Sequence, residues 1–211
     1  MVNGGCMKTY TLKDGERFVK AARNAIELYI KSPRFDRGII EKTLEEYNEK
    51  SGVFVTIDHY PTMSLRGCIG FPRAVGPLKT LLVEAAIAAA TEDPRFAPLS
   101  VHELNEVIIE VSILTEPQEI KAKTPDEKKK EIKIGRDGLI IEYGFYSGLL
   151  LPIVPIEEHW DVDEFLENVC IKAGLPIDAW KRSNVTLYKF QSQVFREEEP
   201  NGKVIEIKME K

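Results

Sequence analysis

GVFVTIDHYPTMSLRGCI, residues 52–69, contains two apolar segments separated by a polar stretch. Val, Ile, Phe and Thr fill the first segment, 52–57, and β-branched and aromatic residues of this kind favour strands. Residues 58–63 include Pro61, which is typical of a turn. The second segment, 64–69, returns to strand-forming residues. The sequence therefore predicts two neighbouring strands joined by a turn.

Around these strands, the apolar residues alternate between helical and extended patterns. Phe18, Ala22 and Ala25 recur at helical spacing, and Asp14 stands where a helix N-cap is expected. The first half of the chain is predicted to contain a helix over 13–31, a short solvated helix over 41–50, a helix that opens at Gly76-Pro77, a helical turn at 101–104 and a strand over 107–114.

The second half repeats this order of elements, although the residues themselves do not repeat. Its predicted elements are strands over 138–143 and 148–151 joined by residues 144–147, a helix capped by Asp161 with Glu164 at its third position, a strand over 185–195 and an edge strand over 204–209. Between the halves, residues 124–131 predict a short capped helix or a charged linker. We therefore expect an α+β fold with mainly antiparallel strands and helices that cover the sheet.

The composition sets limits on the class of protein. A length of 211 residues fits one large domain or two small ones, and 43% hydrophobic residues exclude a disordered chain. The net charge of −5 argues against a nucleic-acid clamp, which usually carries a basic stripe. Lys and Glu are abundant, whereas Gln occurs only at positions 118, 191 and 193. This bias is typical of hyperthermophiles and predicts a thermophilic source.

The cysteines and the apolar segments indicate the compartment. Cys6, Cys68 and Cys170 are odd in number and far apart, so we expect no disulfide framework of a secreted protein. The sequence has no run approaching the ~20 apolar residues of a membrane helix, and residues 1–7 lack the pattern of a signal peptide. We therefore expect a cytoplasmic protein that binds neither membrane nor nucleic acid.

Several motifs resemble those of the AMMECR family, which is named after a disease-associated chromosomal region. Residues 65–70, LRGCIG, are similar to the signature of this family. The other segments that resemble it are residues 93–96 (DPRF) followed by 98–99, 109–113 (IEVSI), 138–142 (GLIIE), 148–152 (GLLLP), 160–161 with 164–166, and 170–176 (CIKAGLP). With these motifs, the resemblance extends over roughly residues 12–195.

The resemblance implies a fold of two related β-rich repeats with helices, in which both repeats share one barrel-like sheet. It places an AMMECR-type domain over residues 12–195, with subdomains at about 12–120 and 132–195. Residues 1–11 are then an N-terminal tail, and residues 196–211 a C-terminal edge strand or tail.

The family has no established activity, so the resemblance leaves the reaction and any cofactor unknown. Prokaryotic members resemble domains that are encoded beside, or fused to, a Memo-type metalloprotein-like domain and a radical S-adenosylmethionine enzyme. The resemblance therefore implies a role in a modification system, with a Memo-type or radical S-adenosylmethionine protein as partner.

Cys68 is the candidate catalytic residue, and two interpretations of it remain open. Gly67 and Gly70 would leave the backbone and the sulfur accessible to a ligand, and Arg66 would favour the reactive thiolate. Alternatively, the glycines permit a tight bend of the sheet and Cys68 packs as a small hydrophobe. The histidines give no support for a catalytic partner. Cys170 lies on the apolar stripe of its helix and is expected to be structural.

Arg66 and Arg95 are the candidate anion-binding residues. Arg95 lies between Pro94 and Phe96, and a guanidinium group held by a rigid loop suits bidentate recognition of a carboxylate or phosphate. Alternatively, each arginine is tied to a carbonyl or to an acidic neighbour. We expect no metal site, because no pair of cysteines or histidines has metal-ligand spacing.

The leading hypothesis is that Arg66, Gly67, Gly70 and Arg95 bind a small anionic ligand in a cleft that also contains Cys68. Whether the protein is then an enzyme stays open. The alternative is a non-catalytic adaptor in which the two arginines contact a partner protein and Cys68 is structural.

Overall fold

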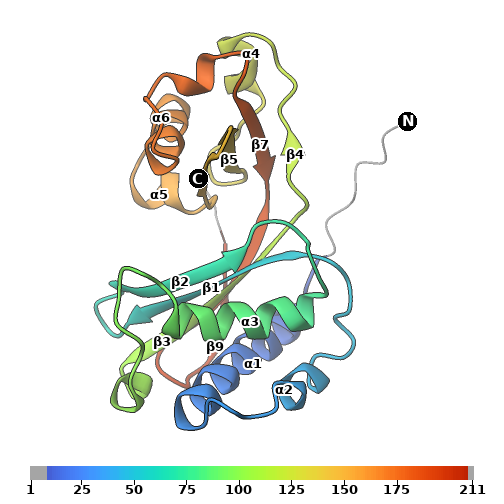
Figure 1. Ribbon diagram of the computed structural model, residues 1–211, viewed down its shortest axis with the longest axis vertical. Helices are drawn as coiled ribbons and strands as arrows, with labels where there is room; N and C mark the ends of the chain where they lie inside the picture. Colours follow the sequence, from blue (N-terminus) through green and yellow to red (C-terminus); the bar gives the residue numbers. More distant parts are fainter. Residues whose placement is uncertain (1–8, 209–211) are drawn as a thin grey trace. The chain divides into compact units, whose positions relative to one another are not determined.

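The computed structural model describes residues 9–208, which divide into two compact units (Figure 1). The described part of unit 1 is residues 9–114 and 193–207, and that of unit 2 is residues 115–192 and 208. The predicted mixture of helices and antiparallel strand pairs is confirmed. The prediction of one shared, barrel-like sheet is wrong, because the strands form two open sheets of five and four strands.

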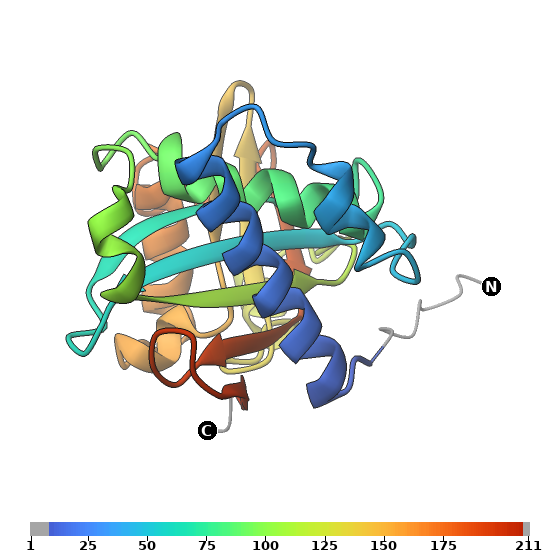
Figure 2. The same cartoon turned by 90° about the horizontal axis from the view of Figure 1, so that it is seen from below.

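Unit 1 contains the five-stranded sheet, whose strand order is β2-β1-β3-β8-β9. Its elements are α1 (Leu12–Lys31), α2 (Gly38–Lys42), β1 (Gly52–His59), β2 (Leu65–Phe71), α3 (Leu78–Thr91), the 3₁₀ helix η1 (Val101–Asn105), β3 (Val107–Leu114), β8 (Ser192–Glu197) and β9 (Val204–Ile207). Strand β1 pairs antiparallel with both β2 and β3. Figures 1 and 2 show α1 and α3 on the same face of this sheet.

The core of unit 1 follows from the alternation of side chains along β1. Val53, Val55 and Ile57 are fully buried and point to the face that α1 and α3 cover. Phe18 of α1 and Leu82 of α3 belong to the same buried cluster. The side chains between the buried ones in β1 therefore point to the opposite face of the sheet.

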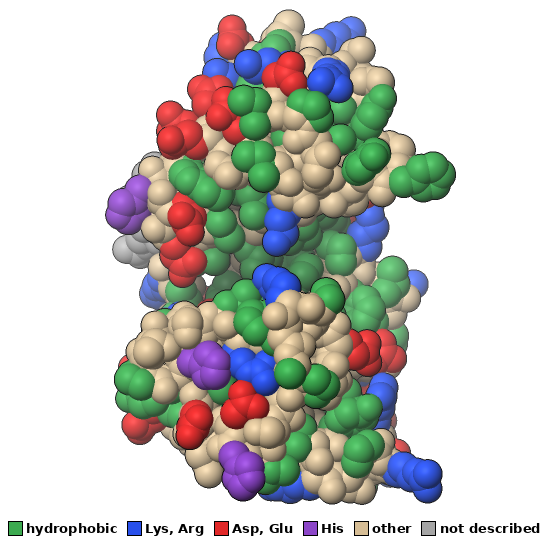
Figure 3. All heavy atoms as spheres, turned by 60° about the vertical axis from the view of Figure 1, so that its left-hand side comes forward, with side chains coloured by type: hydrophobic (Ala, Val, Ile, Leu, Met, Phe, Trp, Pro, Cys, Tyr) green, Lys and Arg blue, Asp and Glu red, His purple; other side chains and the backbone are tan. Residues whose placement is uncertain are grey.

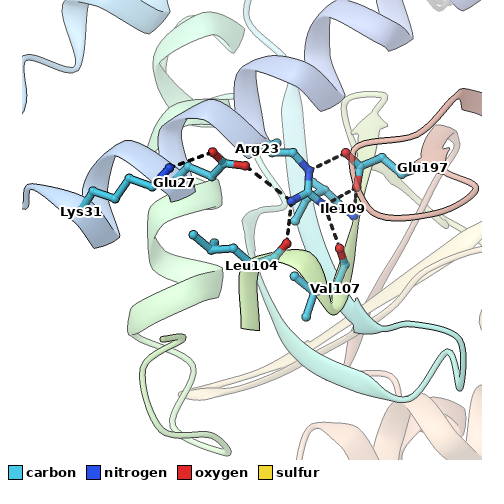
Figure 4. A network of polar contacts seen from close by, with 7 residues as sticks. All are labelled: Arg23, Glu27, Lys31, Leu104, Val107, Ile109 and Glu197. Atoms are coloured by element: carbon cyan, nitrogen blue, oxygen red, sulfur yellow. Dashed lines mark hydrogen bonds and ion pairs between the residues drawn. The ribbon is translucent and has the colours of Figure 1, made fainter. Parts of the chain in front are cut away.

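A buried ion pair ties the end of β8 to α1 (Figure 4). Arg23 Nε donates to Glu197 Oε1 at 2.6 Å, and both side chains are more than nine-tenths buried. The guanidinium also donates to the carbonyl oxygens of Leu104 and Val107, and Glu197 accepts from the amide of Ile109. The pair thus joins a helix near the start of the chain to a strand near its end.

Unit 2 contains the four-stranded sheet, whose strand order is β4-β7-β5-β6. Its elements are β4 (Gln118–Glu119), α4 (Pro125–Lys130), β5 (Gly138–Tyr143), β6 (Tyr146–Leu150), α5 (Val154–Glu157), α6 (Val162–Lys172), η2 (Ala179–Lys181) and β7 (Thr186–Phe190). The core of unit 2 includes Leu139 and Ile141 of β5, Phe165 of α6 and Trp180 of η2.

The predicted repeat in the order of elements is confirmed. Both units contain a hairpin, a helix and a third strand. The strand order across hairpin and third strand is β2-β1-β3 in unit 1 and β6-β5-β7 in unit 2. A glycine marks the helix contact in each unit. A Cβ atom on Gly67 would lie 2.2 Å from the carbonyl oxygen of Ala89 in α3, and one on Gly148 would lie 2.8 Å from that of Val169 in α6. In both units a glycine lets the helix backbone approach the hairpin.

Some predicted boundaries differ from the structure. Thr11, rather than Asp14, is the N-cap of α1, and Asp14 completes a capping box with it. The solvated helix predicted over 41–50 is wrong: α2 ends at Lys42, and Leu44 and Tyr47 are buried. These two residues pack into the core that α1 forms, so this segment is not a solvated surface.

The strand predicted over 185–195 is wrong as a single element. The chain leaves the unit 2 sheet after Phe190 and enters the unit 1 sheet at Ser192, so β7 and β8 belong to different sheets. The predicted helix at 124–131 and the Asp161–Glu164 capping box are confirmed. The edge strand predicted over 204–209 is confirmed as β9, except that Met209, like the tail residues 1–8, lies outside the described residues. Over residues 9–208, every helix is too short or too polar to cross a membrane.

Candidate functional site

The LRGCIG motif forms the edge strand β2 of unit 1. Cys68 is paired with Thr56 of β1, which is paired in turn with Glu110 of β3. Paired residues on antiparallel strands point to the same face, and Thr56 alternates with the buried residues Val55 and Ile57. Cys68, Thr56 and Glu110 therefore form a row on the face opposite α1 and α3. The Thr56 hydroxyl donates to the Cys68 sulfur at 3.4 Å.

The two glycines of the motif have a packing role. A Cβ atom on Gly67 would meet the backbone of α3, as described above, and one on Gly70 would lie 2.3 Å from the carbonyl oxygen of Val53. These distances are too short for any side chain, so each position requires glycine for the approach of helix or strand. Ligand binding by Gly67 and Gly70 stays a prediction.

Asp93 connects the loop after α3 to the edge strand. Its carboxylate accepts hydrogen bonds from the amide of Cys68 at 2.9 Å and from the amide of Arg95 at 3.1 Å. It also accepts from Arg95 Nε at 2.9 Å and from Arg95 Nη2 at 2.6 Å. The Arg95 guanidinium, followed by the backbone donors, holds the pKa of Asp93 well below its usual range. The sequence-based prediction did not include Asp93, although an aspartate that accepts from the amide two residues on is a common turn motif.

Arg66 is tied to the neighbouring 3₁₀ helix by Glu103. Arg66 Nε and Nη2 donate to the two carboxylate oxygens of Glu103 at 2.7 Å and 3.3 Å. Glu103 also accepts from Ser100, with which it forms a capping box at the start of η1. Chiefly because of the Arg66 hydrogen bond, the pKa of Glu103 is lowered to about 2. The sequence-based prediction missed Glu103, although the Ser100-x-x-Glu103 spacing is that of a capping box.

The structure brings the two predicted arginines together at Phe96. The guanidinium carbons of Arg66 and Arg95 lie 5.8 Å and 5.5 Å from the centroid of this ring. The two carbons can therefore be no more than 11.3 Å apart. The two side chains differ in exposure. That of Arg66 is 10% exposed and that of Arg95 is 47% exposed, so Arg95 is the one that presents a cation to solvent.

The thiol of Cys68 is in an environment that favours its protonated form. Burial raises its pKa, and the charges of Glu110 and Asp93 raise it further, whereas the Thr56 hydroxyl and Arg95 lower it. Arg95 is thus the cation that acts on this thiol, in the place the sequence analysis gave to Arg66. Cys68 itself is half-buried, and the net effect of these groups is a raised thiol pKa.

The other cysteine of the described chain has structural contacts. Cys170 is fully buried in α6, and its sulfur accepts hydrogen bonds from the backbone amides of Trp180 and Ala179 at η2. Burial raises the pKa of its thiol. Cys6 lies outside the described residues. Between residues 9 and 208, no three His, Cys, Asp or Glu side chains are grouped so that they could hold a metal ion.

Exposed apolar side chains come from the same segments as the Arg66–Glu103 pair and from the adjoining turn. We call Tyr60, Met63, Leu65 and Val101 the hairpin–η1 surface, because they come from the β1–β2 turn, β2 and η1 and are 37–50% exposed. The amide of Tyr60 donates to the carbonyl oxygen of Glu106, which fixes the turn against the end of η1. On the face drawn in Figure 3, acidic, basic and hydrophobic side chains are interspersed, without a continuous stripe of one charge.

The family model described as AMMECR1 matches residues 19–195, which include every site residue discussed above. The chain belongs to the AMMECR1 family. Among the relatives of this AMMECR1 protein, Protein MJ0810 of Methanocaldococcus jannaschii is 51% identical over 203 residues, covering 96% of this chain and 100% of the relative. A protein of Thermococcus gammatolerans is 50% identical over 200 residues, with coverage of 92% and 97%.

A solved structure has the same fold as this AMMECR1 chain. The crystal structure of uncharacterized protein PH0010 from Pyrococcus horikoshii matches with a TM-score of 0.88 at 46% identity, covering 93% of this chain and 97% of that one. The two-unit architecture is therefore shared with an experimentally determined relative.

Proposed function

We propose that this AMMECR1 protein is a non-catalytic adaptor that binds a partner protein through the hairpin–η1 surface and Arg95. One observation carries the proposal. The guanidinium groups of Arg66 and Arg95 are each bound through Nε and Nη2 to a carboxylate of the same chain. The side-on nitrogen pair of each guanidinium is thus already bound to a carboxylate that balances its charge, and only the end-on edge, Nη1 with the second hydrogen of Nη2, is left for a small anion.

The neighbouring side chains support the same function. Leu65 directly precedes Arg66, and Met63 and Val101 are also exposed. Apolar and aromatic side chains around an arginine are a common composition for protein interfaces. The raised pKa of the Cys68 thiol gives no support to a thiolate nucleophile.

The partner implied by the family resemblance is a Memo-type or a radical S-adenosylmethionine protein. The test is a binding titration of each purified candidate partner from the same genome against the immobilised full chain. We expect Leu65→Ser to weaken binding about 5- to 30-fold, the effect of losing an interface contact worth ~1–2 kcal/mol. Val75→Ser is the matched control, because Val75 is a 71% exposed apolar side chain of unit 1 outside the hairpin–η1 surface. Equal binding by wild type and both variants would remove the support for this surface.

The second candidate function is recognition of a small anionic ligand, with or without an enzymatic reaction. It is favoured by the convergence of Arg66 and Arg95 on Phe96 and by the exposure of Arg95. Metabolite mass spectrometry on natively purified protein, with Cys68→Ser as control, tests it. A ligand that is retained by wild type and lost from Arg95→Gln would favour this function over the adaptor.

A further inference from the structure

The Asp93–Arg95 pair has a fixed orientation, with the anion inside and the cation outside. The Asp93 side chain is 3% exposed, whereas that of Arg95 is 47% exposed. Asp93 accepts from Nε and Nη2 of Arg95, so the two hydrogens of Nη1 and the second hydrogen of Nη2 are the donors that this carboxylate leaves to other acceptors. An incoming group therefore meets an arginine whose charge is already balanced.

An external anion cannot readily displace Asp93 from Arg95. The carboxylate also accepts from the amides of Cys68 and Arg95, so it is fixed by the backbone as well as by the ion pair. Pulling Arg95 away would leave a buried carboxylate without its cation, and an unpaired buried charge is strongly unfavourable. Ligand binding at Arg95 must therefore occur with the pair intact.

The same balance holds at Arg66. Glu103 accepts hydrogen bonds from Nε and Nη2 of Arg66, and the Arg66 side chain is only 10% exposed. The charges of these two arginines and two carboxylates cancel. What remains at Phe96 is an aromatic ring beside the guanidinium donors of two ion pairs, each of which has zero net charge as a whole.

We infer that Asp93 is a specificity-determining residue, which makes Arg95 select uncharged carbonyl groups of a polypeptide over phosphate or carboxylate groups. This inference rests on the proposed function and names the chemistry of the partner. An extended peptide segment offers such carbonyl oxygens, and its planar amides and apolar side chains can pack on Phe96 and on the hairpin–η1 surface. A phosphate would gain only an ion–dipole contact in exchange for its hydration.

The experiment uses inorganic phosphate as the probe and isothermal titration of the full chain at low ionic strength. We expect wild type to bind phosphate in the millimolar range or more weakly. Asp93→Asn keeps one oxygen acceptor, enough for one of the two amides, because Cys68 N donates to Oδ2 and Arg95 N to Oδ1. It removes the charge, so Arg95 becomes an unbalanced cation. Its affinity for phosphate should rise at least about tenfold, as a charge-assisted contact becomes available. The double variant Asp93→Asn/Arg95→Gln should lose this gain.

Two results would overturn the inference. One is submicromolar to micromolar phosphate binding by wild type, which requires no variant to fold. The other is an Asp93→Asn protein with a native melting profile and unchanged phosphate affinity. Failure of the adaptor function is a separate result, because it is measured with purified partner proteins and without phosphate.

Discussion

Replacement of Glu197 by alanine should be among the most destabilising single substitutions at a charged residue of unit 1. Glu197 and Arg23 are 4% and 6% exposed, and they are joined by two hydrogen bonds (Figure 4). In Glu197→Ala, Arg23 keeps the carbonyl oxygens of Leu104 and Val107 and the more exposed carboxylate of Glu27 at 3.8 Å, but it loses its buried counter-charge. Removing one partner of a buried ion pair typically costs about 3–5 kcal/mol. We expect a decrease of this size in the free energy of unfolding.

The measurement is chemical denaturation followed by far-UV circular dichroism, with a double-mutant cycle. Arg23→Met combined with Glu197→Ala should cost about 2–3 kcal/mol less than the sum of the single variants, because the double variant leaves no unpaired charge. Glu46→Ala is the matched control. Glu46 pairs with Arg17, also of α1, but the two side chains are 60% and 35% exposed, so solvent screens the pair and the loss should be much smaller than in Glu197→Ala. The reasoning fails if Glu197→Ala costs no more than Glu46→Ala, or if the two substitutions are additive.

Three further predictions concern the candidate site. Gly67→Ala should lower the free energy of unfolding by about 1–3 kcal/mol, because its Cβ would meet the backbone of α3. Gly76→Ala, whose Cβ would have ordinary contacts at 3.5 Å, should change this free energy little, and denaturation curves of the two variants test the difference. The pKa of Glu103 is lowered to about 2 in the folded chain, whereas that of an unfolded glutamate is ~4.3. Ionised Glu103 therefore stabilises the folded state fully above pH ~4.3, and this stabilisation is lost as the pH falls toward 2. Glu103→Gln should therefore flatten this part of the acid-denaturation profile, and an unchanged profile would contradict the assignment. Cys68 should react with a thiol reagent at least about tenfold faster than the fully buried Cys170. The reaction rate of Cys68 should keep rising above pH ~8.5, because burial raises its pKa, and a plateau below that pH would contradict this prediction.

The elements that the sequence predicted correctly depend on residues close together in the chain. Strands β1 and β2 are separated by a short turn, and the Asp161–Glu164 capping box spans three positions. Such signals act within one or two turns of backbone, so they can be found without knowledge of the fold. The segment after α2 was mispredicted because its charged residues outnumber Leu44 and Tyr47, which tertiary packing nevertheless buries.

The partners of the candidate site residues depend on the tertiary fold. Arg66 and Glu103 are 37 positions apart, and Arg23 and Glu197 are 174 positions apart. The sequence identified Arg66 and Arg95 as constrained cations, but it left open whether each faces a ligand or a carboxylate of the chain. Folding of η1 against β2 places Glu103 beside Arg66, whereas Asp93 reaches Arg95 within the same loop, from two positions away. The same contacts change the expected chemistry, because a paired arginine is a poor anion receptor.

The repeat within the chain separates what packing requires from what unit 1 has in addition. Gly67 and Gly148 occupy the same place in their hairpins: each is paired with an isoleucine of the neighbouring strand and faces the backbone of a helix, α3 for Gly67 and α6 for Gly148. The residues on either side of Gly148 are Ser147 and Leu149, where unit 1 has Arg66 and Cys68. A hairpin can therefore pack on its helix without an arginine or a cysteine at these positions. Arg66 and Cys68 are additions specific to unit 1, and with Arg66 comes the tie to η1 that fixes the hairpin–η1 surface. This difference between two similarly built units is the reason for assigning partner recognition to unit 1.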